Sequence, residues 1–463
     1  MAELDLTPSA IDTIAAISTP PGRGGIGIVR LSGPLAHSIA GQLVQLRQPL
    51  EHARARLADV VDPEASGGVS APIDQALVTF FAAPNSYTSD DLVEIAAHGS
   101  PVVLDYLLRR SIALGARLAE PGEFTQRALL SGRIDLTQAE AVRDLIEAQT
   151  LTQARQAASQ MGGALSRRVA PVKQSLVELI ALLEAGIDFA EDDIDVTPQN
   201  EIARRLAELA TPLASLEASF SRGRIVHEGL TLAIVGRPNA GKSSLFNCLV
   251  ERERAIVTPS PGTTRDTVTE RISLDGIPLE LVDTAGMREA HDVAEQLGVA
   301  RSREALADAA IVLVVLDATQ PLNAEECELL AAVQNRPALV AVNKSDLGNQ
   351  EHAAAPQLAG LPVLATSALT GQGVPDLRQR ILALASGGAA SEPGMLTSLR
   401  HHQAVSGALT AVEDAARSNA SAVPHEMILL DLYRALSALD SLTGQTTTDD
   451  ILNLIFSSFC IGK

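Results

Sequence analysis

The sequence predicts a multidomain α/β protein in which an α/β domain is inserted into a helical one. Residues 227–385 alternate apolar strand-like runs with helical segments, which is typical of a doubly wound α/β domain. Residues 129–226 and 386–463 follow a helical pattern with few breakers, and they are expected to pack together as one discontinuous domain. Residues 1–128 combine short strand-like runs, bounded by Gly and Pro, with a helix, which indicates a separate N-terminal module.

Composition limits the classes of protein to which this chain can belong. The 463 residues suffice for two to four domains, and aromatic residues make up only 2%, so aliphatic side chains must fill the cores. The net charge of −20 argues against non-specific nucleic-acid binding, so such a partner requires a local basic patch or a bridging protein. Three scattered cysteines fit a reducing, cytoplasmic compartment better than a disulfide framework or a metal site.

Neither a targeting segment nor a membrane span is expected. The first fifteen residues include Glu3, Asp5 and Asp12, which have the wrong sign for a signal or transit peptide. The apolar run 309–316 is too short to cross a bilayer and reads as a buried strand.

The N-terminal and helical segments have their own expected elements. Strands are predicted at 13–18, 25–31 and 75–80, followed by a helix at 101–114. The apolar residues of that helix are expected on one face: Leu104, Leu107, Leu108 and Ile112. Two features are expected to interrupt the long helical region that starts near residue 124, namely Pro171 and the stretch 188–198.

A glycine-rich motif lies at the start of the α/β region. Residues 236–243, GRPNAGKS, match G-x-x-x-x-G-K-[ST] between a predicted strand at 230–235 and a predicted helix at 244–249. The glycines let backbone N–H groups approach phosphates, Lys242 neutralises their charge, and Ser243 offers a hydroxyl to Mg²⁺. The motif predicts a nucleoside-triphosphate site.

Two further motifs supply the switch segments of such a site. The sequence DTAG at 283–286 follows a predicted strand at 278–282, so Asp283 is expected beside the Mg²⁺ and the Gly286 N–H beside a γ-phosphate. The segment GTTRD at 262–266 lies between this motif and the phosphate loop, and its Thr264 can offer a hydroxyl to Mg²⁺.

The last motifs select the base. The sequence NKSD at 343–346 follows a predicted strand at 338–342, and Asp346 can accept hydrogen bonds from guanine N1 and N2, which adenine does not offer. Ser367 and Ala368 follow a predicted strand at 362–365 and support the base through their backbone. Together the ordered motifs predict a Ras-like P-loop GTPase domain. The residues expected to contact GTP are Asn239, Ala240, Gly241, Lys242, Ser243, Ser244, Thr258, Pro259, Ser260, Pro261, Gly262, Thr263, Thr264, Asp283, Thr284, Ala285, Gly286, Asn343, Lys344, Asp346, Ser367 and Ala368.

One position departs from the pattern of small signalling GTPases. Met287 follows the DTAG motif, where those enzymes place a water-orienting Gln. Either hydrolysis is very slow or another group acts, such as a monovalent cation held near Asn239 and the 262–264 segment. Glu295 is a second candidate for orienting water, although spacing alone favours a solvated helical residue there.

Segments outside the GTPase motifs carry a family resemblance. They include DTIAA at 12–16, PPGRGG at 20–25, RLSG at 30–33, NSYT at 85–88, VEI at 93–95, HG at 98–99, PGEFTQR at 121–127, DLTQAEA at 135–141 and FCIGK at 459–463. With them, essentially the whole chain resembles the MnmE (TrmE) family of tRNA modification GTPases, in the TrmE–Era–EngA-type class. The resemblance implies an N-terminal α+β folate-binding-like domain (1–128), a discontinuous helical domain (129–226 and 386–463) and the inserted GTPase domain (227–385).

The resemblance also implies roles for particular residues. A formyl-tetrahydrofolate, such as 5-formyl-tetrahydrofolate, is expected at Arg30, Glu94, Arg133 and Lys463; the family commonly has Lys where Arg133 stands. Ser89 likewise replaces a usual Gly. The implied metal ligands are Asn239, Thr258, Ser260 and Thr263 for K⁺, and Ser243 and Thr264 for Mg²⁺. The resemblance also implies that Glu295 orients the attacking water, which reverses the interpretation of Glu295 from spacing alone.

The implied activity depends on partners. Potassium bound between paired GTPase domains activates hydrolysis in this family, and the N-terminal domain forms a homodimer. A flavoprotein of the MnmG (GidA) type completes a heterotetramer that reaches the tRNA. Together they add an aminomethyl or carboxymethylaminomethyl group at C5 of the wobble uridine of certain tRNAs.

Several alternatives stay open at this point. One alternative is that the chain is a ribosome-assembly GTPase, which predicts a basic RNA-binding module that is not apparent. Another is that the flanking segments have a purely structural role, which predicts that they have no affinity for folate. Cys460 is a functional thiol or a small buried residue, and His98 touches the one-carbon ligand or makes a structural hydrogen bond. The acidic run between Glu184 and Asp195 is a metal or partner site or, preferably, a solvated helix end.

Overall fold

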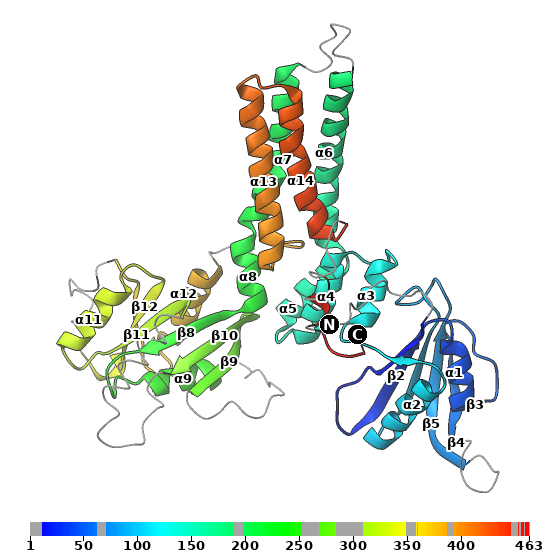
Figure 1. Cartoon of the computed structure of the whole chain (residues 1–463). Coiled ribbons are helices and arrows are strands. Elements are labelled where there is room, and N and C mark those ends of the chain that lie inside the picture. The colour runs from blue at the N-terminus through cyan, green and yellow to red at the C-terminus, as the bar shows by residue number, and fades with distance from the viewer. Residues whose placement is uncertain are drawn as a thin grey trace, which may run out of the picture. The chain divides into compact units, whose positions relative to one another are not determined.

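A computed structural model of the chain describes residues 12–62, 71–188, 198–251, 268–283, 309–348, 358, 360–386, 392–445, 452, 455–457 and 459–462. These residues fall into two compact units. The first comprises residues 1–143 with 440–463, and the second comprises residues 144–439. Each unit contains one β-sheet (Figure 1).

The sheet of the first unit has seven strands in the order β3-β4-β5-β6-β2-β1-β7. Its strands are β1 (Ile14–Ile17), β2 (Gly24–Ser32), β3 (Val44–Leu46), β4 (Ala55–Asp62), β5 (Ala71–Phe81), β6 (Leu92–Gly99) and β7 (Arg117–Leu118). Helices α1 (Ala36–Leu43) and α2 (Pro101–Ala113) pack against the sheet (Figure 1). Because side chains alternate along a strand, Val60 and Val78 join the core, whereas Leu57 and Leu77 lie exposed on the other face.

The strands expected at 13–18, 25–31 and 75–80 are confirmed as β1, β2 and part of β5, and the helix at 101–114 is confirmed as α2. Of the four residues expected on one face of α2, Ile112 near its C-terminal end is exposed. The buried positions are Leu104, Leu107 and Ser111, which follow the helical repeat of three and four residues. The Ser111 hydroxyl donates to the Leu107 carbonyl at 2.7 Å, so it can be buried there.

The helical region contains α3 (Glu123–Leu130), α4 (Leu136–Glu147), α5 (Leu151–Met161), α6 (Ala164–Asp188), α7 (Gln199–Ala218), α8 (Phe220–Glu228), α13 (Leu399–Ala420) and α14 (His425–Thr443). Helices α7 and α13 lie side by side, so segments from either side of the α/β region pack together (Figure 1). The interruption expected at Pro171 is wrong, because α6 continues through it. A proline removes one backbone hydrogen bond, and burial of Val169, Val172 and Leu176 around it favours the continuous helix. Among the described helices, none is long and apolar enough to cross a membrane.

The sheet of the second unit has six strands in the order β13-β12-β11-β8-β10-β9. They are β8 (Leu230–Val235), β9 (Val268–Leu274), β10 (Ile277–Asp283), β11 (Ile311–Asp317), β12 (Ala338–Asn343) and β13 (Val363–Ala365). All are parallel except β9, which pairs antiparallel with β10, and the helices are α9 (Lys242–Glu251), α11 (Ala324–Val333) and α12 (Val374–Ser386). The carboxyl ends of the parallel strands share one edge, which is where ligands bind in sheets of this kind.

Candidate nucleotide-binding site

The loop between β8 and α9 is a tight turn pressed against the neighbouring strands. Gly236, Asn239 and Gly241 have positive φ angles of 144°, 61° and 92°. A Cβ atom at Gly236 would lie 2.2 Å from the Val315 carbonyl oxygen, and one at Gly241 would lie 2.1 Å from Nδ2 of Asn343. The glycines are therefore required for the loop to wrap around the start of α9, where backbone N–H groups are available to an anion.

Lys242 opens α9 and folds back over this loop. Its Nζ donates to the carbonyl oxygens of Gly236 at 2.7 Å and Arg237 at 2.8 Å, and only 6% of the residue is exposed. Ser243 and Ser244, the next two residues, are exposed. A buried lysine beside an exposed serine at a helix N-terminus fits a phosphate group with its metal ion.

Asn343 connects three loops at the carboxyl edge of the sheet. Its Nδ2 donates to the Ala240 carbonyl at 3.0 Å, and its Oδ1 accepts the Ala368 N–H at 3.0 Å. The Ala368 carbonyl in turn accepts the Cys248 thiol at 2.9 Å. Asn343 is 1% exposed, so it is a buried brace that fixes the phosphate loop relative to the loop that ends in Ala368.

The base-recognition residues lie beside this brace. Asp346 belongs to the short helix η2 (Ser345–Leu347) and is exposed, as a residue that meets a ligand must be. Ser367 is buried, and its hydroxyl accepts the Thr370 N–H at 3.2 Å. The structure thus gathers the predicted phosphate-loop, NKSD and Ser367–Ala368 residues at one edge.

Two charged residues at this edge were missed in the sequence. Asp317 ends β11 and pairs with Lys344 at 2.7 Å, and Glu326 pairs with Arg237 of the phosphate loop at 3.2 Å. Both carboxylates are 2% exposed. The sequence could have predicted Asp317 as a site residue. An acidic residue at the end of an all-apolar strand lies at the ligand-binding edge of a parallel sheet.

The remaining predicted residues of this site lie outside the described part of the chain. They are Thr258, Pro259, Ser260, Pro261, Gly262, Thr263, Thr264, Thr284, Ala285, Gly286, Met287 and Glu295. Asp283 is described as the last residue of β10, where its backbone pairs with Ile234 of β8. The K⁺ set and the second Mg²⁺ ligand thus remain predictions.

The first unit brings together two of the residues expected at a folate. Arg30 of β2 lies directly opposite Glu94 of β6, and its Nε and Nη2 donate to Glu94 Oε1 at 3.0 and 2.7 Å. Its Nη1 donates to the Gly462 carbonyl at 3.3 Å, which attaches the C-terminal segment to the sheet. The Arg30 guanidinium carbon also lies 6.0 Å from the centroid of the Tyr87 ring and 5.5 Å from that of the Phe124 ring.

The charges of two residues expected at the folate, Arg30 and Arg133, act on the Tyr87 phenol. Burial raises the pKa of Tyr87, while the hydrogen bond with Thr125 and the charges of Arg30 and Arg133 oppose that rise. Lys463 lies outside the described residues.

The structure places the two residues whose interpretation was open. Cys460 is exposed, so the buried alternative is wrong, and its carbonyl accepts the Gly122 N–H at 3.4 Å. His98 shows the structural hydrogen bond, because its Nδ1 lies 2.6 Å from Oδ1 of Asp74. Of the acidic run, Glu184 accepts a hydrogen bond from the Tyr433 hydroxyl.

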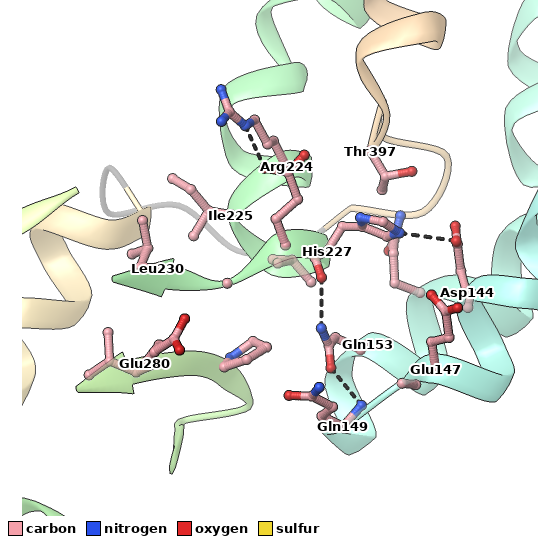
Figure 2. A pocket seen from close by; sticks show the side chains of 18 of the residues that line it. Asp144, Glu147, Gln149, Gln153, Arg224, Ile225, His227, Leu230, Glu280 and Thr397 are labelled. Carbon is pink, nitrogen blue, oxygen red and sulfur yellow. Dashed lines mark hydrogen bonds and ion pairs between the residues drawn. The ribbon is translucent and has the colours of Figure 1, made fainter. Parts of the chain in front are cut away.

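A cavity in the 144–439 unit was not anticipated. It has a volume of about 650 Å³ and lies between α5, α8 and β10. Figure 2 shows the Gln153 side chain reaching the His227 carbonyl, with Asp144 beside the His227 ring. The cavity does not contain the phosphate-loop residues.

Comparison with known proteins adds family information. A family model described as the MnmE helical domain matches residues 136–460, and one described as the GTP-binding protein TrmE N-terminus matches residues 13–133. The tRNA modification GTPase MnmE of Koribacter versatilis is 57% identical over 98% of this chain and 99% of its own length. That of Chloroflexus aurantiacus is 42% identical over 98% of this chain and 100% of its own length. A solved structure of Era from Aquifex aeolicus bound to GDP·AlF4⁻ is 28% identical, with a TM-score of 0.28 over 39% of this chain and 66% of that chain.

Proposed function

The chain belongs to the MnmE family of tRNA modification GTPases and is a GTP hydrolase of that family; from this premise we propose that potassium-activated GTP hydrolysis drives its part in modifying wobble uridines. The observation that carries the proposal is the Asn343 brace, which fixes the phosphate loop beside the NKSD loop. A site with separate anchors for phosphate and guanine matches GTP as a whole.

Each part of the nucleotide has residues suited to hold it. Lys242 and the N–H groups at the start of α9 would bind the phosphates, Ser243 with Thr264 would hold Mg²⁺, and Asp346 would select guanine. Bound Mg²⁺ and K⁺ would offset the negative charge that develops on the phosphates during hydrolysis.

The hydrolytic step needs groups other than a glutamine. Since Met287 cannot orient water by hydrogen bonding, we assign that role to Glu295. Asn239, which is exposed in the phosphate loop, would contribute to a K⁺ site with oxygens of Thr258, Ser260 and Thr263.

The first unit would supply the one-carbon group. Arg30, Glu94, Arg133 and Lys463 are proposed to bind 5-formyl-tetrahydrofolate or a related folate. A homodimer through this unit, joined by a flavoprotein of the MnmG type, would add an aminomethyl or carboxymethylaminomethyl group at C5 of the wobble uridine. With a net charge of −20, this chain would reach tRNA through that cytoplasmic complex.

Two measurements test the proposal. GTP hydrolysis is measured at constant ionic strength in KCl and in NaCl, for the wild type and for Asn239→Ala. The rate should rise sharply in K⁺ for the wild type only; equal rates in both salts exclude the cation role.

Nucleoside analysis of tRNA from cells lacking this protein should show an unmodified wobble uridine. The wild-type chain should restore the modification, and Ser243→Ala should not. Modification that survives the deletion would overturn the tRNA assignment.

A titration separates the one-carbon role from a purely structural one. The full-length chain is titrated with 5-formyl-tetrahydrofolate by calorimetry. Saturable binding supports a folate site, whereas no saturable binding would make the first unit a dimerisation scaffold.

A further inference from the structure

The carboxylate of Asp317 is buried at the edge of the sheet and is bound on both oxygens. Its Oδ2 accepts Lys344 Nζ at 2.7 Å, and its Oδ1 accepts the Thr319 N–H at 2.9 Å and the Thr319 hydroxyl at 2.6 Å. Burial alone would raise the pKa of Asp317, but the hydrogen bonds from Lys344 and Thr319 lower it to about 2. The group is therefore a fixed negative charge at neutral pH.

Lys344 has a backbone that its residue type rarely adopts. Its φ is 62°, in the left-handed region, which costs a non-glycine residue free energy unless neighbouring contacts hold it. The preceding Asn343 is fixed by Ala240 and Ala368, so Lys344 is the point at which the chain turns away from β12. The short helix that carries Asp346 begins immediately after this turn.

The ion pair with Asp317 is placed to hold this turn. The Lys344 side chain is about one-third exposed, and its ammonium pairs with the Asp317 carboxylate on the neighbouring strand. Asp317 and Asn343 are also register partners in the β11–β12 pair, so the strand register fixes the Asp317 carboxylate next to the turn at Lys344. A residue held at both backbone and ammonium cannot rotate freely, and the short helix that carries Asp346 follows it directly.

We propose that Asp317 is a positioning residue for base selection, acting through Lys344 to aim Asp346 at the guanine 2-amino group. The inference deepens the proposed GTP site and rests on it. Asp317 does not touch the nucleotide in this proposal; it determines how well the protein distinguishes guanine from a base that lacks the amino group.

The test compares two nucleotides that differ only in that group. Dissociation constants for GDP and IDP are measured on the nucleotide-free full-length protein by competition against a fluorescent GDP analogue. The wild type should bind GDP about tenfold or more tightly than IDP, because IDP leaves part of the Asp346 carboxylate unpaired. In Asp317→Asn the Kd(IDP)/Kd(GDP) ratio should fall by about fivefold, mainly through weaker GDP binding.

A matched variant separates positioning from a general loss of stability. Thr319→Val removes the other side-chain hydrogen bond to the same carboxylate but leaves the Lys344 ion pair, so its ratio should remain that of the wild type. If Asp317→Asn does not fold, Lys344→Met removes the same ion pair from the other side and should lower the ratio equally.

The outcomes distinguish the two levels of the proposal. A wild type that binds GDP and IDP equally contradicts the guanine site itself. A wild type with strong preference, together with an unchanged ratio in Asp317→Asn or in Lys344→Met, overturns the role of Asp317 alone. An equal fall of the ratio in Thr319→Val would show that stability, not the ion pair, controls selection.

Discussion

The hydroxyl of Thr150, at the start of α5, donates to the carbonyl oxygen of Gly276, in the turn between β9 and β10, at 2.7 Å. The same hydroxyl accepts the Gln153 N–H at 3.1 Å, and the Gln153 side chain returns to the Thr150 N–H, which completes a capping box. One side chain thus caps a helix and holds a hairpin turn.

Thr150→Val should remove both functions while keeping the side-chain shape. We expect a loss of about 1–2 kcal/mol in the free energy of unfolding, from the lost cap and the lost hydrogen bond. Urea unfolding of the full-length chain measures it. Thr211→Val on α7 is the control, because the hydrogen bond described for that exposed hydroxyl is to a carbonyl of its own helix. It should change stability by less than about 0.5 kcal/mol. Equal effects of the two variants would contradict the double role of Thr150.

Gly276 should not tolerate even a methyl group. Its φ is 85°, and an added Cβ would lie 2.0 Å from Oγ1 of Thr152. Gly276→Ala should therefore destabilise the chain by more than the roughly 1 kcal/mol expected for backbone strain alone. Gly348→Ala supplies the comparison, because Gly348 also has a positive φ, 126°, but a Cβ added there would meet no described atom within 4 Å. A thermal-melting experiment in which Gly348→Ala is the more damaging change would refute the steric argument.

Gln156 and Gln160 lie on the same helix, line the same cavity, and should respond oppositely to replacement by Leu. Gln160 Nε2 donates to the Met395 carbonyl at 3.0 Å and to the Thr397 hydroxyl at 3.1 Å. Gln156 is also buried, but within the described part of the chain its Nε2 has no hydrogen-bond partner. Figure 2 shows the polar wall that Gln149, Gln153 and Asp144 form in this cavity.

Gln160→Leu should cost about 1–3 kcal/mol, because it leaves a buried carbonyl and hydroxyl without their donor. Gln156→Leu should be neutral or stabilising, because it removes a buried Nε2 group that has no hydrogen-bond partner among the described residues. Chemical denaturation of the two variants in parallel gives the sign directly. A loss of stability in Gln156→Leu as large as that in Gln160→Leu would mean that an ordered group in the cavity binds the Gln156 amide.

Local patterns were enough to predict most of the nucleotide-site scaffold. Strand β8 was predicted at its observed bounds, and β11 is buried along its whole length as its apolar run requires. The glycine motif also predicted its own context, because its spacing works only between a strand and a helix.

Contacts between distant segments could not be predicted in the same way. Pro171 reads as a helix breaker until its neighbours are seen to be buried, and packing then outweighs local propensity. Asp317 and Lys344 are 27 residues apart, and only the register of β11 on β12 brings them together. The attachment of the C-terminal segment to Arg30 through Gly462 likewise depends on tertiary structure.

Arg30→Lys should weaken folate binding although it keeps the positive charge. A lysine ammonium cannot reproduce the planar guanidinium group, which donates to Glu94 and to the Gly462 carbonyl at once. Both acceptors therefore lose a fixed donor. We expect Kd for 5-formyl-tetrahydrofolate to rise at least about tenfold, in line with the loss of a charge-assisted hydrogen bond. Arg109→Lys, an exposed arginine paired with Asp105 on α2, should bind the folate as the wild type does. Unchanged affinity in Arg30→Lys would remove Arg30 from the proposed site.

Glu295→Ala should separate turnover from nucleotide affinity. If the carboxylate orients water, its loss lowers kcat by about 10²-fold or more, while Kd for GTP stays within about twofold, because the residue stabilises only the reacting state. Single-turnover hydrolysis in KCl gives the rate, and titration with a non-hydrolysable GTP analogue gives the affinity. Glu289→Ala is the matched control, since it removes a carboxylate from the same segment six residues earlier, and its rate should stay close to that of the wild type. A large loss of affinity in Glu295→Ala would show that the residue binds the nucleotide. An equal loss of rate in Glu289→Ala would show that the negative charge of the segment supports hydrolysis, and not one oriented carboxylate.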